Sequence, residues 1–339
     1  MRKFLNLLLA FVLTITLTSC GKKEDKKQDD PGKNEQKEEL KEELKELTII
    51  DVNSNSRPIA VMINNHPEAR PYQSGLQDAY LVYEMIVEGG ITRYMAVFKD
   101  KDTARIGSVR SSRHYYLDYV LENDAIYTHF GGSDRALNDI PKLGINNING
   151  LVHSGFWRDS LPVAYEHTAF TSMENIKSNI SNYGYRNTTT QDTLLNYVGG
   201  DAYNSALEGA IMANNVTIPY SYSTTTSYTY DSTNKVYNRF VNGVAHTDYV
   251  TKAQYNFKNI IIIDVNNYSL DSYGLQELEN KGTGTGYYIT NGYAVPITWE
   301  KTSRESQTVY KYLNGEEIKV SDGNTFIQIK PAYENATIN

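Results

Sequence analysis

Cysteine is almost missing from this sequence, because Cys20 is the only one among 339 residues. An intramolecular disulfide, a cysteine-rich zinc site and an internal thiol nucleophile are therefore excluded. Positive charge is also scarce, since 40 acidic residues outnumber 33 lysines and arginines. Proteins that bind nucleic acid need concentrated positive surface, so nucleic acid is not an expected partner. A mean hydropathy of −0.51 excludes a protein with many membrane spans.

Familiar catalytic and metal-binding motifs are missing as well. The sequence contains no G-x-S-x-G elbow, no H-E-x-x-H helix and no G-x-x-x-x-G-K-[ST] loop. Ser232 and Lys235 match a serine–lysine spacing, but they fall at a predicted hairpin tip, whereas that nucleophile needs a helix. The six histidines do not repeat at ligand spacing, and His153 with Glu166 and His167 forms only a weak zinc set. We therefore assign no metal and no cofactor.

The first 20 residues predict an export signal with a lipid anchor. Arg2 and Lys3 precede an apolar run over 4–17 that is too short to span a bilayer, which needs about 20 residues. The run ends in Leu-Thr-Ser-Cys20 followed by glycine, which resembles the signal of bacterial lipoproteins. We predict that acylated Cys20 anchors the chain on the extracytoplasmic face of the bacterial cell membrane, with the bilayer as its partner. An ordinary secretory signal is the alternative.

A charged tether and two folded parts are expected after the signal. Residues 21–47 contain 18 charged residues and no aromatic residue, so they cannot bury enough apolar surface to fold alone. After Asn187 the composition shifts to threonine, serine, asparagine and tyrosine. We predict an α+β protein with an α/β-type domain, a mixed sheet with helices, over 48–215 and a β-rich antiparallel domain over 216–339.

The first folded part contains a strand and a hairpin that bring charged residues together. The apolar run over 57–64 predicts a buried strand. Two β-rich runs on either side of Gly89-Gly90 predict a hairpin with a two-residue turn, in which residue 86 faces residue 93. In that register Glu84, Glu88 and Arg93 share one face. The three residues form either an acid/base site or a surface ladder that fixes the register.

Two helix beginnings in the same part predict an anion site. Ser111 or Ser112 can cap a helix over 113–121, which places Arg110 and Arg113 at its amino end. Cations are disfavoured there, and an anion bound by the arginines resolves the conflict. A strand over 125–130 then leads into a glycine turn and a second helix capped by Ser133. The predicted ligand-binding residues are Asn64, Asn65, His66, Arg93, Arg110, Arg113, His129, Gly131, Gly132 and Ser133.

The second folded part predicts an antiparallel meander. Strand-like runs alternate with turns, including Asn-Gly dipeptides at 242–243, 291–292 and 314–315, and 259–265 reads as a buried strand. The chain also contains 28 tyrosines, many of them in these strands. A carbohydrate platform is one interpretation. Half-buried strand positions, which suit a ring with a polar tip, are the more common explanation.

Several segments together resemble a known family. RPIAVMINNHPEARPYQSGL, YEMIVEGGITRYMAVF, RIGSVRSSRHYY and AIYTHFGGS are similar to the YerB-like bacterial lipoproteins, whose domains are of unknown function. The resemblance covers about residues 57–332. It implies a membrane-anchored, extracytoplasmic protein of two α+β parts with a role in the envelope or cell wall. Ser108 and His114 stand where the family is expected to carry proline.

Three functions fit these observations. The first is a non-catalytic binding or scaffolding module for an anionic cell-wall component or a membrane-protein partner. The second is a hydrolase or lyase of cell-wall glycan or peptide, with Glu84 or Glu88 as acid/base and the 131–133 turn as anion hole. The third, a solute-binding lipoprotein of a transporter, predicts two doubly wound lobes, which the β-rich second part argues against.

Overall fold

The computed structural model describes residues 47–51, 53–202 and 204–339, all of which belong to one compact unit. The predicted signal over 1–20, the acylation site Cys20 and the tether up to residue 46 lie outside the described residues. Among the described residues, no helix combines the length and the apolar character needed to cross a membrane.

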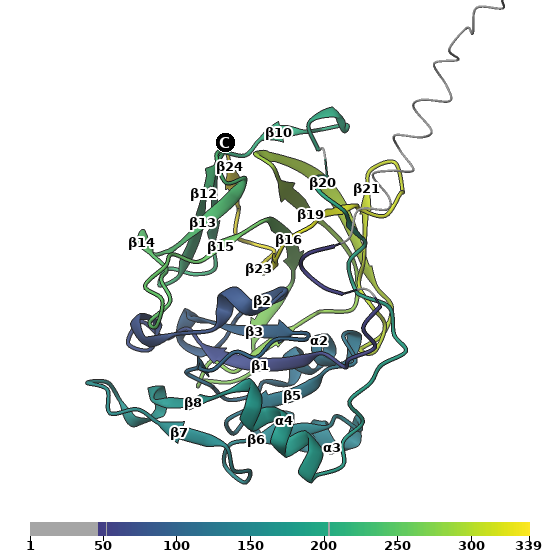
Figure 1. The fold of residues 1–339 in the computed structure, drawn as a ribbon. Helices are drawn as coiled ribbons and strands as arrows, with labels where there is room; N and C mark the ends of the chain where they lie inside the picture. The colour runs from purple at the N-terminus through teal and green to yellow at the C-terminus, as the bar shows by residue number, and fades with distance from the viewer. Residues whose placement is uncertain (1–46, 52, 203) are drawn as a thin grey trace, which may run out of the picture. The chain divides into compact units, whose positions relative to one another are not determined.

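A strongly mixed sheet of eleven strands runs through the unit (Figure 1). The strand order is β10-β20-β19-β16-β23-β2-β3-β1-β5-β6, and β21 pairs with β20. The strands from the first part are β1 (Ile59–Asn64), β2 (Leu81–Ile86), β3 (Thr92–Phe98), β5 (Ile126–His129) and β6 (Asn147–Asn149). The others are β10 (Ile211–Met212), β16 (Asn259–Val265), β19 (Gly282–Thr290), β20 (Tyr293–Lys301), β21 (Val309–Tyr312) and β23 (Thr325–Pro331).

Strand β23 joins the two parts of the chain into this one sheet. It pairs in parallel with β16 on one side and with β2 on the other. Its residues are buried throughout, as are those of β1 and β2, because both faces of the sheet are covered. The sequence predicts β23 as part of a meander, whereas it returns to the centre of the sheet. The proposed division at residue 215 stays a prediction.

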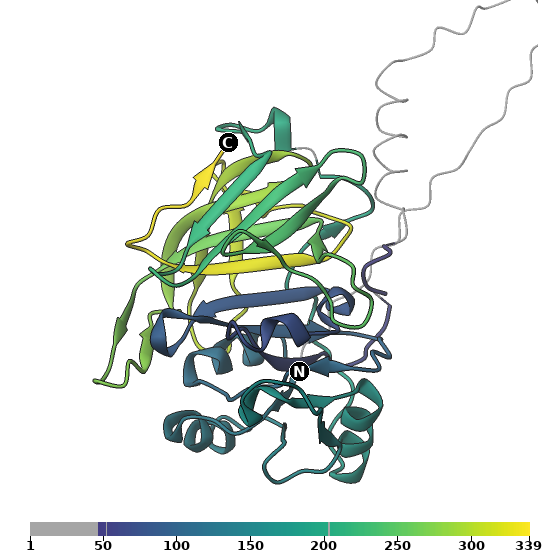
Figure 2. The same ribbon diagram turned by 90° about the vertical axis from the view of Figure 1, so that its left-hand side faces the viewer.

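A second sheet of six strands packs on one face of the first (Figure 2). It consists of β11 (Asn215–Pro219), β12 (Thr225–Asp231), β13 (Val236–Val241), β14 (Val244–Ala245), β15 (Asn256–Phe257) and β24 (Thr337–Ile338). Alternate residues of β13 are buried, as expected for a strand with one covered face. Tyr228 and Phe257 contact Phe326 of β23, with ring centroids 6.3 and 4.8 Å apart. Aromatic packing therefore holds the two sheets together.

Helices cover the other face of the first sheet (Figure 1). The α-helices are α2 (Leu117–Glu122), α3 (Asp134–Lys142) and α4 (Met173–Asn182). The 3-10 helices are η1 (Arg70–Tyr72), η2 (Leu76–Asp78), η3 (Glu88–Gly90), η4 (His114–Tyr116), η5 (Tyr165–His167) and η6 (Asn204–Ala206). Small sheets join β4 (Ile106–Gly107) with β8 (Ala169–Thr171) and β7 (Phe156–Arg158), β9 (Tyr197–Val198) with β22 (Val320–Ser321), and β17 (Asn267–Ser269) with β18 (Gln276–Leu278). The predicted α+β class is thus confirmed.

The hairpin between β2 and β3 forms, but its predicted register is wrong by one residue. Met85, not Ile86, faces Arg93, and Ile86 faces Thr92. The reason is a turn of three residues, 88–90, closed by a 2.8 Å hydrogen bond from Val87 N to Ile91 O. A shift of one residue moves side chains to the opposite face of a sheet. Glu84 and Arg93 consequently point to different layers.

The predicted cap of the helix over 113–121 is also wrong. The segment begins as the 3-10 helix η4 and continues as α2, and no side chain caps its start. The two serines instead form hydrogen bonds with the segment of β5 and the residue after it. Ser111 Oγ donates to Phe130 O at 3.1 Å, and Ser112 Oγ accepts from Tyr127 Oη at 2.9 Å. Ser133, in contrast, caps α3 as predicted by accepting from Ala136 N.

Many tyrosines are fully buried rather than half-buried. Tyr83, Tyr115 and Tyr116 are at most 1% exposed, and each hydroxyl has a partner. Tyr116 Oη donates to Arg93 O at 2.7 Å, for example. These three rings pack between the sheet and the helices, and Tyr228, Tyr237 and Tyr288 in the strands of the second part are also at most 1% exposed, so none of these six rings is available as a carbohydrate platform.

Candidate functional site

Strands β1 and β5 run in parallel, and their carboxyl ends meet at one edge of the sheet. Ligand sites of mixed and parallel sheets commonly lie at such an edge. The loop over 108–113 crosses it: Arg110 N donates to Met62 O at 2.9 Å, and Phe130 N donates to Arg110 O at 3.0 Å. Ser112 forms a parallel bridge with Gly132. The loop thus brings the 110–113 segment beside the end of β1 and beside the turn at 131–132.

Two arginines and one glutamate form the charged centre of this edge. Arg113 donates from Nε and Nη2 to the two carboxylate oxygens of Glu88, at 2.5 and 2.8 Å. Both side chains are partly covered, with 15% of Arg113 and 25% of Glu88 exposed. Burial alone would raise the pKa of Glu88, but the hydrogen bonds and charge of Arg113 outweigh it, and the pKa is lowered. Glu88 is therefore an ion-pair partner at neutral pH.

Arg93 lies behind this pair and is only 4% exposed. Its Nη1 donates to Ser111 O at 2.5 Å. No carboxylate among the described residues lies within the 4.0 Å of an ion pair with Arg93. Burial and the charge of Arg113 together lower the pKa of Arg93 to about 10. A buried guanidinium without a close counter-charge is costly, so this position favours the approach of an anion.

The remaining predicted donors at this edge are already engaged. Arg110 turns away from the arginine pair and binds Glu166 at 3.1 Å. His129 is buried, and its two ring nitrogens contact Gly131 O and Asn147 Oδ1 at 2.7 and 3.1 Å. The glycine turn is not an open anion hole, because Gly131 N donates to Asn149 Oδ1 at 2.9 Å. His129 and the turn instead fix the end of β5.

Glu84 lies on the opposite face of the sheet from Arg93 and is fully buried. It forms an ion pair with Arg239 of the second sheet, with 2.7 Å between Oε2 and Nη2. It also accepts from Thr92 Oγ1 at 2.6 Å. The predicted group of Glu84, Glu88 and Arg93 is therefore not formed, and Glu84 and Glu88 do not make an acid/base pair.

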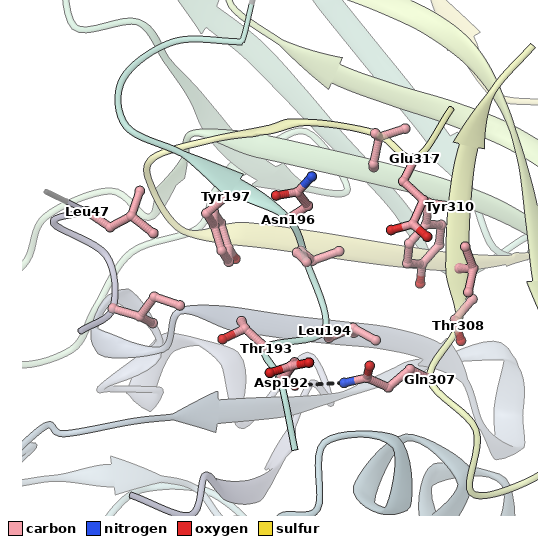
Figure 3. A pocket seen from close by; sticks show the side chains of 14 residues that line it. Leu47, Asp192, Thr193, Leu194, Asn196, Tyr197, Gln307, Thr308, Tyr310 and Glu317 are labelled. Atoms are coloured by element: carbon pink, nitrogen blue, oxygen red, sulfur yellow. Dashed lines mark hydrogen bonds between the residues drawn. The ribbon is translucent and has the colours of Figure 1, made fainter. Parts of the chain in front are cut away.

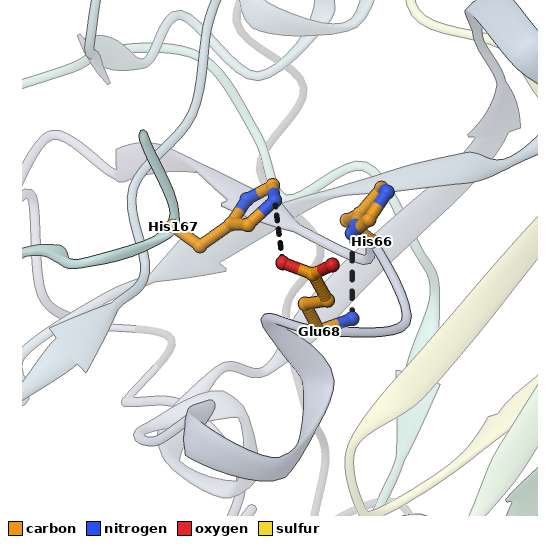
Figure 4. A group of neighbouring side chains, drawn as sticks. All are labelled: His66, Glu68 and His167. Atoms are coloured by element: carbon orange, nitrogen blue, oxygen red, sulfur yellow. Dashed lines mark hydrogen bonds and ion pairs between the residues drawn. The ribbon is translucent and has the colours of Figure 1, made fainter. Parts of the chain in front are cut away.

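The loop after β1 contains a group that the sequence did not predict. Asn64 Oδ1 accepts from His66 N at 3.0 Å, and its Nδ2 contacts His167 Nδ1 at 2.8 Å. The rings of His66 and His167 are stacked, with centroids 4.5 Å apart. The carboxylate of Glu68 lies beside them (Figure 4). The sequence links His167 to His153, whereas the fold brings it to His66, because η5 packs beside the end of β1.

A cavity of about 390 Å³ lies elsewhere, next to the first described residues (Figure 3). Leu47 and Ile50 form one side, and a hydrogen bond of 2.9 Å joins Gln307 Nε2 to Asp192 O across it. Its lining comes from segments 192–197, 307–310 and 317–318. The sequence contains no signal for this cavity, because its walls are loop residues and strand ends that lie far apart in the chain.

Comparison with known proteins gives consistent matches. Residues 47–186 match the N-terminal domain, and residues 216–327 the C-terminal domain, of a protein family of unknown function, DUF3048. The Bacillus subtilis (strain 168) protein provisionally named lipoprotein YerB is 30% identical over 288 residues, which is 84% of each chain. The crystal structure of YerB from Bacillus subtilis superposes with a TM-score of 0.72 at 29% identity, covering 84% of this chain and 94% of that one.

Proposed function

This chain belongs to the DUF3048 family of YerB-like proteins, and we propose that it is a lipid-anchored module on the extracytoplasmic face of the cell membrane that binds an anionic component of the cell wall. The name of the relative supports a lipoprotein. Cys20 at the end of an apolar signal supports the anchor and the face. The binding role is argued from the arginines at the sheet edge.

One observation carries the binding role: Arg93 is buried beside Arg113 without a carboxylate of its own. Two guanidinium groups share the charge of Glu88, so the group as a whole keeps a positive excess. A phosphate or carboxylate bound beside Arg113 supplies the missing negative charge, because ion pairs and charge-assisted hydrogen bonds with guanidinium groups are strong. No bond-breaking step is needed for this role, and the acid/base pair for one is not formed.

The test compares binding with stability in full-length protein purified in detergent. The probes are carboxylate-bearing wall fragments and a phosphodiester polymer, measured by calorimetry. Arg93→Met removes the charge but keeps most of the volume. Because an unpaired buried charge is unfavourable, this variant should melt at the same or a higher temperature than the wild type. It should nevertheless bind the anionic probe at least about tenfold more weakly, since charged hydrogen bonds are worth about 1.5–3 kcal/mol.

The matched control is Arg186→Gln. Arg186 pairs with the carboxylate of Asp124 at 2.7 Å, unlike Arg93, and it lies outside this edge. The control should bind the probes like the wild type. Unchanged affinity in Arg93→Met, together with a lower melting temperature, would show that the arginine is structural and would overturn the proposed function.

A further inference from the structure

His66, Glu68 and His167 form a compact set of possible metal ligands on the loops beside β1 (Figure 4). One ligand atom from each residue lies within 4.8 Å of the others. His167 Nε2 is 3.9 Å from Glu68 Oε2. Two ligands of one tetrahedral zinc ion are separated by about 3.3 Å, given bonds of about 2.0–2.1 Å. The set therefore needs to contract by about 0.6 Å between His167 and Glu68, and by no more than about 1.5 Å elsewhere.

Ring nitrogens of both histidines face Glu68. His66 Nδ1 accepts a long hydrogen bond, 3.3 Å, from the backbone N of Glu68, so its lone pair points to the main chain of that residue. A bond of this length is weak and is easily exchanged for a metal. His167 Nε2 faces the carboxylate itself. Figure 4 shows the carboxylate beside the two rings.

His167 is held by the fold, whereas His66 and the carboxylate of Glu68 are more exposed. The side chain of His167 is 4% exposed and that of Glu68 is 55% exposed. The rings are nearly parallel, with 15° between their planes. Convergence on one ion therefore requires a rotation of the half-buried His66 and a swing of Glu68. Both residues belong to the short loop between β1 and η1 and have room to adjust.

Asn64 supplies the second layer of such a site. Histidines that bind metals usually donate their other ring N–H to a carboxylate or a carbonyl oxygen. Asn64 Nδ2 contacts His167 Nδ1 at 2.8 Å, and a half-turn of the amide would present oxygen to that nitrogen at the cost of the bond that Oδ1 accepts from His66 N. The charge of Arg110 acts on His167 and opposes a cation, but the carboxylate of Glu166 at 3.1 Å offsets it.

We propose that His66, Glu68 and His167 bind one divalent transition-metal ion of the zinc class. Two imidazoles and one carboxylate suit zinc, cobalt, nickel or iron, whereas magnesium and calcium prefer oxygen ligands alone. Three protein ligands also leave a coordination position for water or for an oxygen of a ligand. The proposal does not depend on the role of the arginines.

The experiment uses untagged, full-length protein in detergent after treatment with a chelator. Zinc chloride is titrated by calorimetry, and cobalt chloride is followed by its visible absorption spectrum. We expect one ion per chain and a tetrahedral cobalt spectrum. Because loss of an outer partner alone costs about 10–100-fold in affinity, Glu68→Gln and His167→Ala should each lose at least that much. His153→Ala, which alters a histidine outside the set, is the matched control and should bind like the wild type.

Two features keep the test decisive. Glu68 is exposed, so Glu68→Gln should remain folded and its loss of binding cannot be attributed to unfolding. Asn64→Asp should tighten zinc binding about tenfold or more, since a carboxylate always accepts the Nδ1 proton of metal-bound His167. Equal zinc affinity in the wild type and Glu68→Gln, or magnesium binding as tight as zinc binding, overturns the proposal.

Discussion

The ion pair between Glu84 and Arg239 lies between the two sheets, and its disruption should be among the most damaging single changes in the molecule. Both side chains are 0% exposed, and their charged atoms are 2.7 Å apart. Glu84→Gln keeps the shape of the side chain but leaves Arg239 buried without a counter-charge. Removal of one partner of a buried pair costs about 3–5 kcal/mol. At about 2 °C per kcal/mol for a chain of this size, the melting temperature should fall by at least about 6 °C.

A double variant separates the cost of leaving Arg239 unpaired from the net contribution of the ion pair to stability. Glu84→Leu with Arg239→Met removes both charges, and Arg239 already packs over the ring of Phe326, 4.7 Å from its centroid. Replacement of a buried pair by apolar residues is often neutral, so the double variant should regain most of the stability in urea unfolding. Glu166→Gln, which breaks an exposed pair, should cost no more than about 1 kcal/mol. A loss below about 1 kcal/mol in Glu84→Gln would refute the reasoning.

Three further outcomes follow from single features. Arg113 lowers the pKa of Glu88 below its ordinary 4.5, so the pair stabilises the fold above that pH. The difference in unfolding free energy between the wild type and Glu88→Gln should therefore shrink as pH falls below about 4.5, and a constant difference contradicts the ion pair. Gly286→Ala would place a Cβ 1.9 Å from Ile262 O, so the free energy of unfolding in urea should fall by about 1–3 kcal/mol. An unchanged urea midpoint argues against this strand pairing. Cys20→Ser should move the protein from membranes to the soluble fraction, and retention without lipid labelling contradicts the anchor.

The local elements were predictable because their signals are local. Continuous apolar runs gave β1 and β16 within two residues, and Asn-Gly dipeptides marked the turns at 242–243 and 291–292. The spacing of Ser133 before an amphipathic segment gave the cap of α3. Each of these features depends on a few neighbouring residues, so tertiary contacts had little to override.

Register and long-range pairing were not predictable from the same signals. A Gly-Gly sequence is compatible with a turn of two residues and with a turn of three. The structure has the three-residue turn, which places Glu84 and Arg93 on opposite faces of the sheet. The partner of Glu84, Arg239, is 155 residues away in the chain. His66 and His167 likewise come from loops that only the packing of η5 beside β1 brings together. The edge of the sheet was therefore predicted, but the partners of its side chains were not.

A chain of buried hydrogen bonds connects this edge to the second sheet, and its proton positions can be assigned. Arg239 can only donate, so His246 Nδ1, 2.7 Å away, must accept. Burial and the charge of Arg239 hold the pKa of His246 well below its usual value, so the ring is neutral and its Nε2 carries the proton. Nε2 therefore donates to Gln73 Oε1, which leaves Gln73 Nε2 to donate to Asn64 O. The loop that carries His66 is thus oriented through Asn64 by the residues that pair with Glu84. These hydrogen bonds therefore connect the packing of the two sheets to the loop of the proposed metal site.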